Sequence, residues 1–265
     1  MSLIPEVDFT ARQYRHLIHA ICRNVACYGI AEFVKAKKED TLKDSYVIMR
    51  HDVDGNAPNC LFMASVEADA GIHSTYYFRM RPKIFRPEII RQIHALGHEV
   101  GYHYEVLADA RGDYTLAQKL FEKNLRKLRE LVPVKSACMH GSSLSKFDNL
   151  DFWKKFRLET FNLLAEPYLT IDYGDMYYFS DTGFCWDNDK FNMRDHVTSQ
   201  KYHGLKSTRG LIQTIEAPSP KKIAILTHTN FWLENQLQWI MTKFLFFALN
   251  NAKRIMKEIK KSSCP

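Results

Sequence analysis

The 265-residue sequence predicts a single α/β domain, built as a barrel or an open sheet of parallel strands. Short β-rich segments alternate with segments whose apolar residues recur at helical spacing, and this alternation favours parallel pairing. Four predicted strands end in histidine or carboxylate residues, at the end of the strand where α/β folds place their active sites. Hydrophobic residues make up 46% of the chain and charged residues 25%, which is ordinary for a globular enzyme and excludes wholesale disorder.

The first half of the chain contains the clearest elements. Thr10 is placed to cap the first helix and Gly29 to end it. Asp113 is placed to cap the longest helix, which stops at Pro133. Helices are therefore expected at about 10–29, 58–71, 87–97 and 113–133, and strands at 46–49, 74–78, 98–105 and 134–139.

The second half is less regular. We expect β-like pieces near 169–173 and 176–179, and a clear apolar strand over 222–227 that ends at His228. A final amphipathic helix is expected at about 234–260, within one domain that spans 1–265. Trp186 and Asp187 are candidates for part of a sugar-binding wall. The alternative for Trp186 is a buried aromatic residue.

The candidate catalytic and metal-binding residues lie at the ends of the predicted strands. Residues two apart in an extended strand point to the same face, so Asp52 and Asp54 can converge on one pocket. The same spacing places His103 and Glu105 together. Two adjacent carboxylates repel, and a bound cation or a raised pKa on one of them relieves the repulsion. The competing interpretation of the Asp pair is a solvated turn at the following glycine.

Two of these segments carry a family resemblance. Arg50-His-Asp-Val-Asp-Gly, followed by Gly97-His-Glu-Val-Gly-Tyr-His, resembles the first two motifs of the polysaccharide deacetylase superfamily (carbohydrate esterase family 4-like), in the bacterial branch with an Arg-His-Asp-Val-Asp motif. The resemblance covers roughly residues 46 to 232 and extends to segments beginning at Met139, Asp181, Trp186 and Leu226. It implies a distorted (β/α) barrel of about seven strands.

The resemblance also implies roles for individual residues. It makes Asp52 the general base, Asp54 and His103 metal ligands, and His228 the general acid, around a divalent metal that is expected to be zinc. The position of the family's second metal histidine is Leu107 here, and the family's Arg-Pro-Tyr motif is replaced by His140-Gly141-Ser142. His140 and Glu105 are the candidates for the third ligand, and His140 is preferred because it preserves the ligand type.

The function implied is that of a hydrolase, a metal-dependent deacetylase that removes an N-acetyl group from a sugar or glycan precursor. Surface-polysaccharide or lipopolysaccharide biosynthesis is the expected setting, with a nucleotide-linked or lipid-linked sugar as substrate. Two alternatives stay open: hydrolysis of another, cyclic amide, and a non-catalytic carbohydrate-binding barrel, which the leucine at the second ligand position favours.

The net charge and the two ends of the sequence allow predictions about binding partners and location in the cell. The formal net charge is +7, and much of the excess follows residue 252. No zinc-finger or RNA-binding spacing accompanies it, so nucleic acid is not expected as a partner. The N-terminal residues have no basic start followed by an apolar core, which predicts a cytoplasmic protein without a signal peptide. The apolar stripe and basic residues of the C-terminal helix make peripheral membrane contact the alternative to packing on the barrel.

Overall fold

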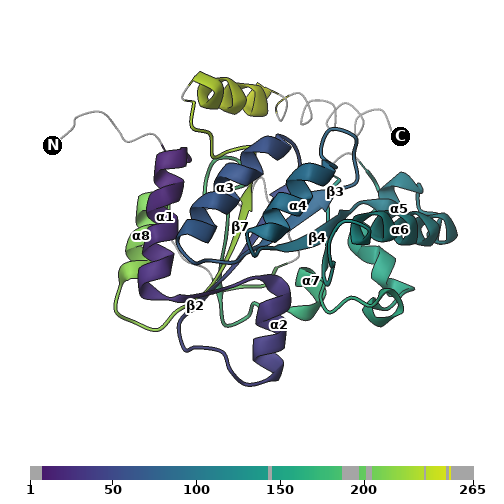
Figure 1. Cartoon of the computed structure of the whole chain (residues 1–265), viewed down its shortest axis with the longest axis horizontal. Coiled ribbons are helices and arrows are strands. Elements are labelled where there is room, and N and C mark those ends of the chain that lie inside the picture. Colours follow the sequence, from purple (N-terminus) through teal and green to yellow (C-terminus); the bar gives the residue numbers. More distant parts are fainter. Residues whose placement is uncertain are drawn as a thin grey trace, which may run out of the picture.

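Seven strands form one curled sheet in the part of the chain that the computed structural model describes, which comprises residues 8–142, 145–186, 197–200, 205–235, 237–248 and 251 (Figure 1). Every pairing between these strands is parallel, which confirms the predicted α/β class. The strands are β1 (Ala26–Tyr28), β2 (Tyr46–Val53), β3 (Thr75–Arg79), β4 (Glu99–Tyr104), β5 (Ala137–Met139), β6 (Tyr177–Ser180) and β7 (Lys222–His228).

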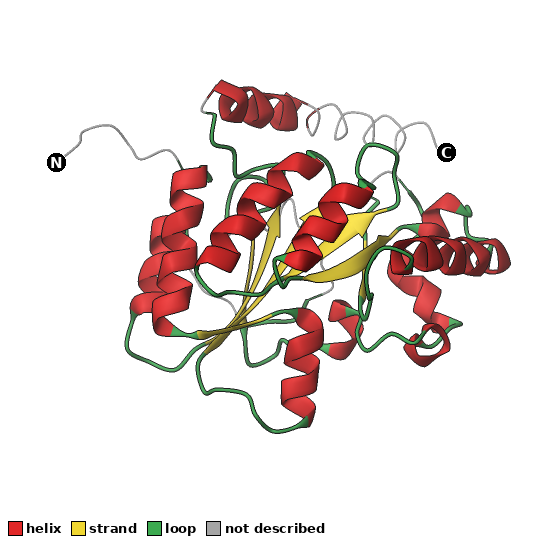
Figure 2. Cartoon of the chain, viewed as in Figure 1, coloured by secondary structure: helices red, strands yellow, loops and turns green. Residues whose placement is uncertain are grey.

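Helices pack around this sheet, as Figure 2 shows. Helix α1 packs on α8, α3 on α4, and α5 on α6. The helices are α1 (Ala11–Asn24), α2 (Ile30–Lys38), α3 (Ala57–Asp69), α4 (Pro87–Ala95), α5 (Val106–Asp109), α6 (Tyr114–Arg129), α7 (Pro167–Thr170) and α8 (Thr208–Glu216), with two 3₁₀ turns at Asn149–Lys154 and Leu158–Phe161 and a further helix over 237–248.

The order of the strands follows the chain around the sheet. Starting from β2, the strands β3, β4 and β5 follow on one side, and β7 and then β6 lie on the other. Strand β1 pairs with the first half of β2. Within the described residues β5 and β6 are the two edges and do not pair with each other. The observed sheet is therefore a half-barrel with the strand order of a (β/α) barrel.

Several boundaries differ from the expectation. The first helix, capped by Thr10 as predicted, ends at Asn24, and Gly29 begins α2 instead of ending α1. The prediction of a strand near 169–173 is wrong: residues 169–170 complete helix α7 and 171–173 form no strand. The helical turn forms because Pro167 fits its first position and the Glu166 carboxylate accepts a hydrogen bond from Tyr168 N. Helix α8, capped by Ser207, was not expected.

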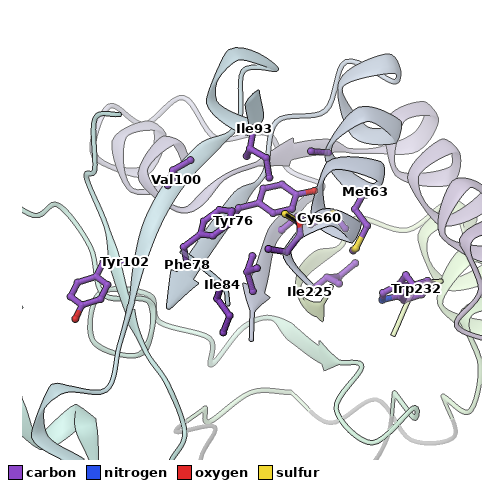
Figure 3. Close-up of a cluster of buried hydrophobic side chains, with 14 of the residues drawn as sticks. Cys60, Met63, Tyr76, Phe78, Ile84, Ile93, Val100, Tyr102, Ile225 and Trp232 are labelled. Atoms are coloured by element: carbon purple, nitrogen blue, oxygen red, sulfur yellow. Dashed lines mark hydrogen bonds between the residues drawn. The ribbon is translucent and has the colours of Figure 1, made fainter. Parts of the chain in front are cut away.

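The two faces of the sheet have different contents. On the outer, helix-covered face, Tyr76 and Phe78 of β3 and Ile225 of β7 pack with Cys60 and Met63 of α3 (Figure 3). The inner face has an apolar floor, in which Tyr46, Ile48 and Ala224 share a second cluster with Tyr77 and Cys138. Side chains alternate between the two faces along each strand. One set therefore forms a core beneath the helices, and the other set fills the base of the interior of the sheet.

Glu67 of α3 joins four elements beneath the outer face of the sheet. This carboxylate is fully buried and pairs with His51 Nε2 of β2 at 2.8 Å. It also accepts hydrogen bonds from Tyr14 of α1, from Ser74 Oγ at 2.5 Å and from the Tyr76 hydroxyl at 3.1 Å. Burial alone would raise the pKa of Glu67, but the neighbouring His51 outweighs it and lowers this pKa to about 2. The carboxylate therefore stays ionised inside the protein.

Because Glu67 accepts all these bonds, we expect Glu67→Gln to lower the free energy of unfolding by about 2–4 kcal/mol. Glu39→Gln is the matched control: its carboxylate is exposed and 3.9 Å from Lys35, so its effect should stay within about 0.5 kcal/mol. Urea denaturation of the three proteins measures both effects. Equal stability of the two variants would show that the buried network does not hold these elements together.

Candidate active site

The register of the strands brings the inward-facing polar residues to two adjacent levels at the carboxyl ends of the strands. Asp52 of β2 lies opposite Tyr77 of β3 on one side and His228 of β7 on the other. His103 of β4 lies opposite Cys138 of β5. Since register partners in a parallel sheet point to the same face, these side chains all face the interior. The predicted convergence of strand ends is therefore seen in the fold.

Arg50 lies one inward position below Asp52 and is 2% exposed. Its guanidinium donates to Cys138 Sγ at 2.6 Å and to the Tyr168 hydroxyl at 2.6 Å, and it lies over the Tyr168 ring. Burial opposes its charge, but Cys138 and the nearby tyrosines raise the pKa of Arg50 further above its usual range. A fixed positive charge therefore lies directly beneath the candidate base.

Asp52, Asp54 and His103 form the centre of the site. His103 Nε2 is 3.6 Å from Asp52 Oδ2 and 3.5 Å from Asp54 Oδ1. The other ring nitrogen of His103 contacts the Cys138 carbonyl oxygen at 3.0 Å, which fixes the ring and directs Nε2 toward the two carboxylates. Burial would lower the pKa of His103, but the two carboxylates raise it.

His140 joins this group from the segment after β5. Its Nε2 is 3.7 Å from Asp54 Oδ1, while its Nδ1 is 3.1 Å from Glu105 Oε2. Burial alone would raise the pKa of Asp54, but the His140 and His103 rings hold it well below its usual range. Asp54 is thus a carboxylate approached by two imidazoles.

Glu105 is held by two arginines. Arg79 donates to both of its oxygens at 2.8 Å, and Arg81 donates to Oε1 at 2.7 Å. Burial would raise the pKa of Glu105, but His140 and Arg81 lower it well below its usual range. With its charge neutralised in this way, Glu105 orients His140 better than it could serve as the third ligand.

His228 is oriented by Asp181, which follows β6 and is fully buried. The Asp181 carboxylate accepts hydrogen bonds from His228 Nδ1 at 2.7 Å, from the His228 backbone N–H at 2.9 Å and from Trp232 Nε1 at 2.8 Å. Burial would lower the pKa of His228, but the Asp181 carboxylate outweighs it and raises this pKa to about 9. His228 is therefore a fixed imidazolium at neutral pH.

The donor atoms of this site fit a metal ion. Oδ1 of Asp52 and of Asp54 are buried and have no hydrogen-bond partner among the described residues. The spacings of 3.5 and 3.7 Å from Asp54 to the two histidines are near the roughly 3.4 Å between ligand atoms on a tetrahedral zinc. Among the described residues, the group whose ligand atoms all lie within 4.8 Å of one another is Asp52, His103 and Cys138, and this group could hold a metal ion.

Trp186 lies apart from this centre. Trp186 is 3% exposed and packs between Phe9 and Trp232, with its Nε1 donating to Thr208. No ring face is left for a sugar, so the contacts match the buried-aromatic interpretation. Asp187 lies outside the described residues. Leu107, at the position of the family's second histidine, is buried in α5.

Sequence reasoning missed several residues that complete the site. Arg79 ends β3 at the same edge as His103, so its place at a strand end was a usable signal. Asp181 begins an Asp-Thr-Gly segment that entered only through the resemblance. The sequence does not identify Cys138 as a site residue, because a cysteine inside an apolar strand is typical of the hydrophobic core. No protein-family model and no curated protein sequence matches this chain.

We expect one divalent ion per chain in protein purified without chelator, and its loss in Asp54→Ala and in His103→Ala, because a site with few ligands cannot spare one. His94→Ala, at an exposed position of α4, is the control and should keep the ion. Elemental analysis by mass spectrometry measures the occupancy. Full occupancy in both site variants would contradict this assignment.

The same measurement identifies the third ligand. Loss of the ion in His140→Ala but not in Cys138→Ser would select the group around Asp54. The reverse result would select the group that contains Cys138 and Asp52, and would leave His140 outside the centre.

Proposed function

We propose that this chain is a metal-dependent deacetylase that hydrolyses an N-acetyl group on a sugar or glycan precursor. One observation carries the proposal: an Asp52 carboxylate and a His228 imidazolium, held on adjacent strands at the same level, flank a set of donors suited to a divalent ion. Amide hydrolysis needs this set, namely a base, an acid and an electrophile. The family resemblance of the Asp52 and His103 segments supports the same assignment, with a distorted (β/α) barrel as the complete fold.

Asp52 serves as the general base in this proposal. The buried Arg50 guanidinium lies beneath Asp52, and Asp52 Oδ1 accepts no hydrogen bond within the described residues. A carboxylate with one uncommitted oxygen can accept the proton of an attacking water.

His228 serves as the general acid. Amide cleavage requires a proton donor, because an amine anion is too poor a leaving group. The bond from Nδ1 to Asp181 leaves Nε2 to donate a proton to the departing nitrogen. Asp181 plays the part of the orienting carboxylate and does not itself contact the reacting atoms.

Asp54, His103 and His140 would hold the metal ion, and zinc suits two imidazoles and a carboxylate. The chemistry that such an ion supplies is polarisation of the amide carbonyl and a lower pKa of water. Glu105 keeps His140 in place through its Nδ1, at 3.1 Å. Release of acetate from N-acetylated sugars, measured with metal content, tests the function; ring opening of a cyclic amide without acetate would favour the alternative hydrolase.

We expect Asp52→Asn to keep the metal ion and to lose turnover by about a hundredfold or more, because asparagine is nearly isosteric but cannot accept a proton. Acetate release and metal content are measured on the same preparation. If this variant loses the ion, Asp52 is a ligand and not the base. If it keeps full activity, the base lies elsewhere, and Glu105 is the next carboxylate to test.

The raised pKa of His228 sets the alkaline limit of activity. A general acid works while protonated, so wild-type turnover should fall as the pH rises through about 9. His228→Ala should lose this limb of the pH profile. Asp181→Asn removes the main charge that raises the pKa of His228, so it should move the limb to lower pH. An unchanged pH profile in both variants, with metal content retained, would remove His228 from the mechanism.

A further inference from the structure

The helix over residues 237–248 has one anchored side. Trp239 is 7% exposed, and its ring meets the Phe184 ring edge-to-face. Phe246, two turns later, contacts Phe184 and Phe231 with ring centroids 5.6 and 5.3 Å apart. The Lys243 ammonium lies 4.7 Å over the Trp239 ring. These contacts fix which side of the helix faces the protein.

The opposite side is apolar and exposed. Its large side chains recur at helical spacing and are between 57% and 77% exposed: Leu237, Ile240, Met241, Phe244 and Leu245. Scattered exposed apolar residues are ordinary on protein surfaces, but five on one short helix form a continuous patch, which marks an interaction surface.

The chain that follows this patch is basic. Residues 252–265 contain Lys253, Arg254, Lys257, Lys260 and Lys261 but a single acidic residue, Glu258. These five positive charges and one negative charge give a formal +4 out of the chain's +7. The helix itself carries Lys243 and no acidic residue. An apolar face with basic residues beside it is complementary to a bilayer that contains anionic lipids.

A second copy of this chain fits the patch less well. Each copy of the chain carries a formal net charge of +7, so two copies repel each other, whereas an anionic lipid surface attracts them. None of the described helices is long and apolar enough to cross a bilayer. The observations therefore favour a helix that lies on a lipid surface.

We propose that the 237–248 helix docks the protein on an anionic membrane surface through its exposed apolar face. The docked helix lies next to the candidate active site, since the Phe231 ring contacts both Phe246 and His228, at centroid distances of 5.3 and 5.6 Å. Figure 1 shows the helix across the top of the molecule, joined to the end of β7 by a short segment. A substrate anchored in the bilayer would thus be close to His228, which selects a lipid-linked N-acetylated sugar. This choice of substrate rests on the proposed function, whereas the docking does not.

Co-sedimentation with vesicles tests the docking without any substrate. Wild-type protein should bind vesicles of phosphatidylcholine mixed with phosphatidylglycerol, and should bind phosphatidylcholine vesicles about tenfold or more weakly. Phe244→Glu combined with Met241→Glu should abolish binding. Both positions are exposed, so the fold does not depend on them. Leu116→Glu, at an exposed leucine of α6, is the matched control and should bind like wild type.

Two outcomes would overturn the docking: no binding of wild type even at low salt, or wild-type self-association that the double variant abolishes while vesicle binding is absent. The second would assign the patch to another copy of the chain. Acetate release tests the substrate separately. The double variant should lose activity on a lipid-linked N-acetylated sugar in vesicles but keep it on a water-soluble one. Equal loss on both would overturn the lipid-linked assignment, and no release by wild type would reject the deacetylase and leave the docking result intact.

Discussion

The pairing of His51 with Glu67 is the contact on which the candidate site depends. His51 points outward from β2, where it also contacts Thr227 of β7 at 2.5 Å. Its neighbours in sequence, Arg50 and Asp52, point inward. One strand therefore carries a buried histidine–carboxylate contact on its outer side and the Asp52 carboxylate on its inner side. Because Tyr14 of α1, Ser74 and Tyr76 of β3 all donate to Glu67 of α3, the position of Asp52 is fixed by groups outside the candidate site.

The inner face balances its charge with side chains from four strands or strand ends. Asp52, Asp54 and Glu105 bring three carboxylates within a few ångströms, and Arg50, Arg79, Arg81 and the histidines lie against them. Unpaired carboxylates at this spacing would repel and take up protons. Arg79 and Arg81 are charged at any physiological pH and help to keep the pKa of Glu105 low, whereas His140 and His103 hold the pKa of Asp54 low.

Sequence reasoning predicted the alternating elements and the inward residues at the strand ends, because both follow from local periodicity. It placed Asp52, Asp54, His103 and His228 on three strand ends that the sheet brings together. It overlooked Arg79, although this residue also ends a strand, and it could not find Asp181 or Cys138 as parts of the site, since these act through contacts between segments far apart in the chain. Sequence reasoning also predicted an extended segment near 169–173. In the structure, the side-chain cap from Glu166 and the ring of Pro167 favour a helical turn there instead.

The unpaired edges of β5 and β6 have a consequence for how this architecture can vary. In a closed barrel the number, tilt and stagger of the strands are coupled, so a change in one strand shifts them all. The described half-barrel has no such closure, and only single bridges, Ser136 with Ala165 and Tyr177 with Gln200, flank its edges. Loops after β5 and around β6 can therefore lengthen or shorten in related sequences while β2, β4 and β7 keep their register. The surroundings of the candidate site can thus vary near β5 and β6, independently of the polar residues on β2, β4 and β7.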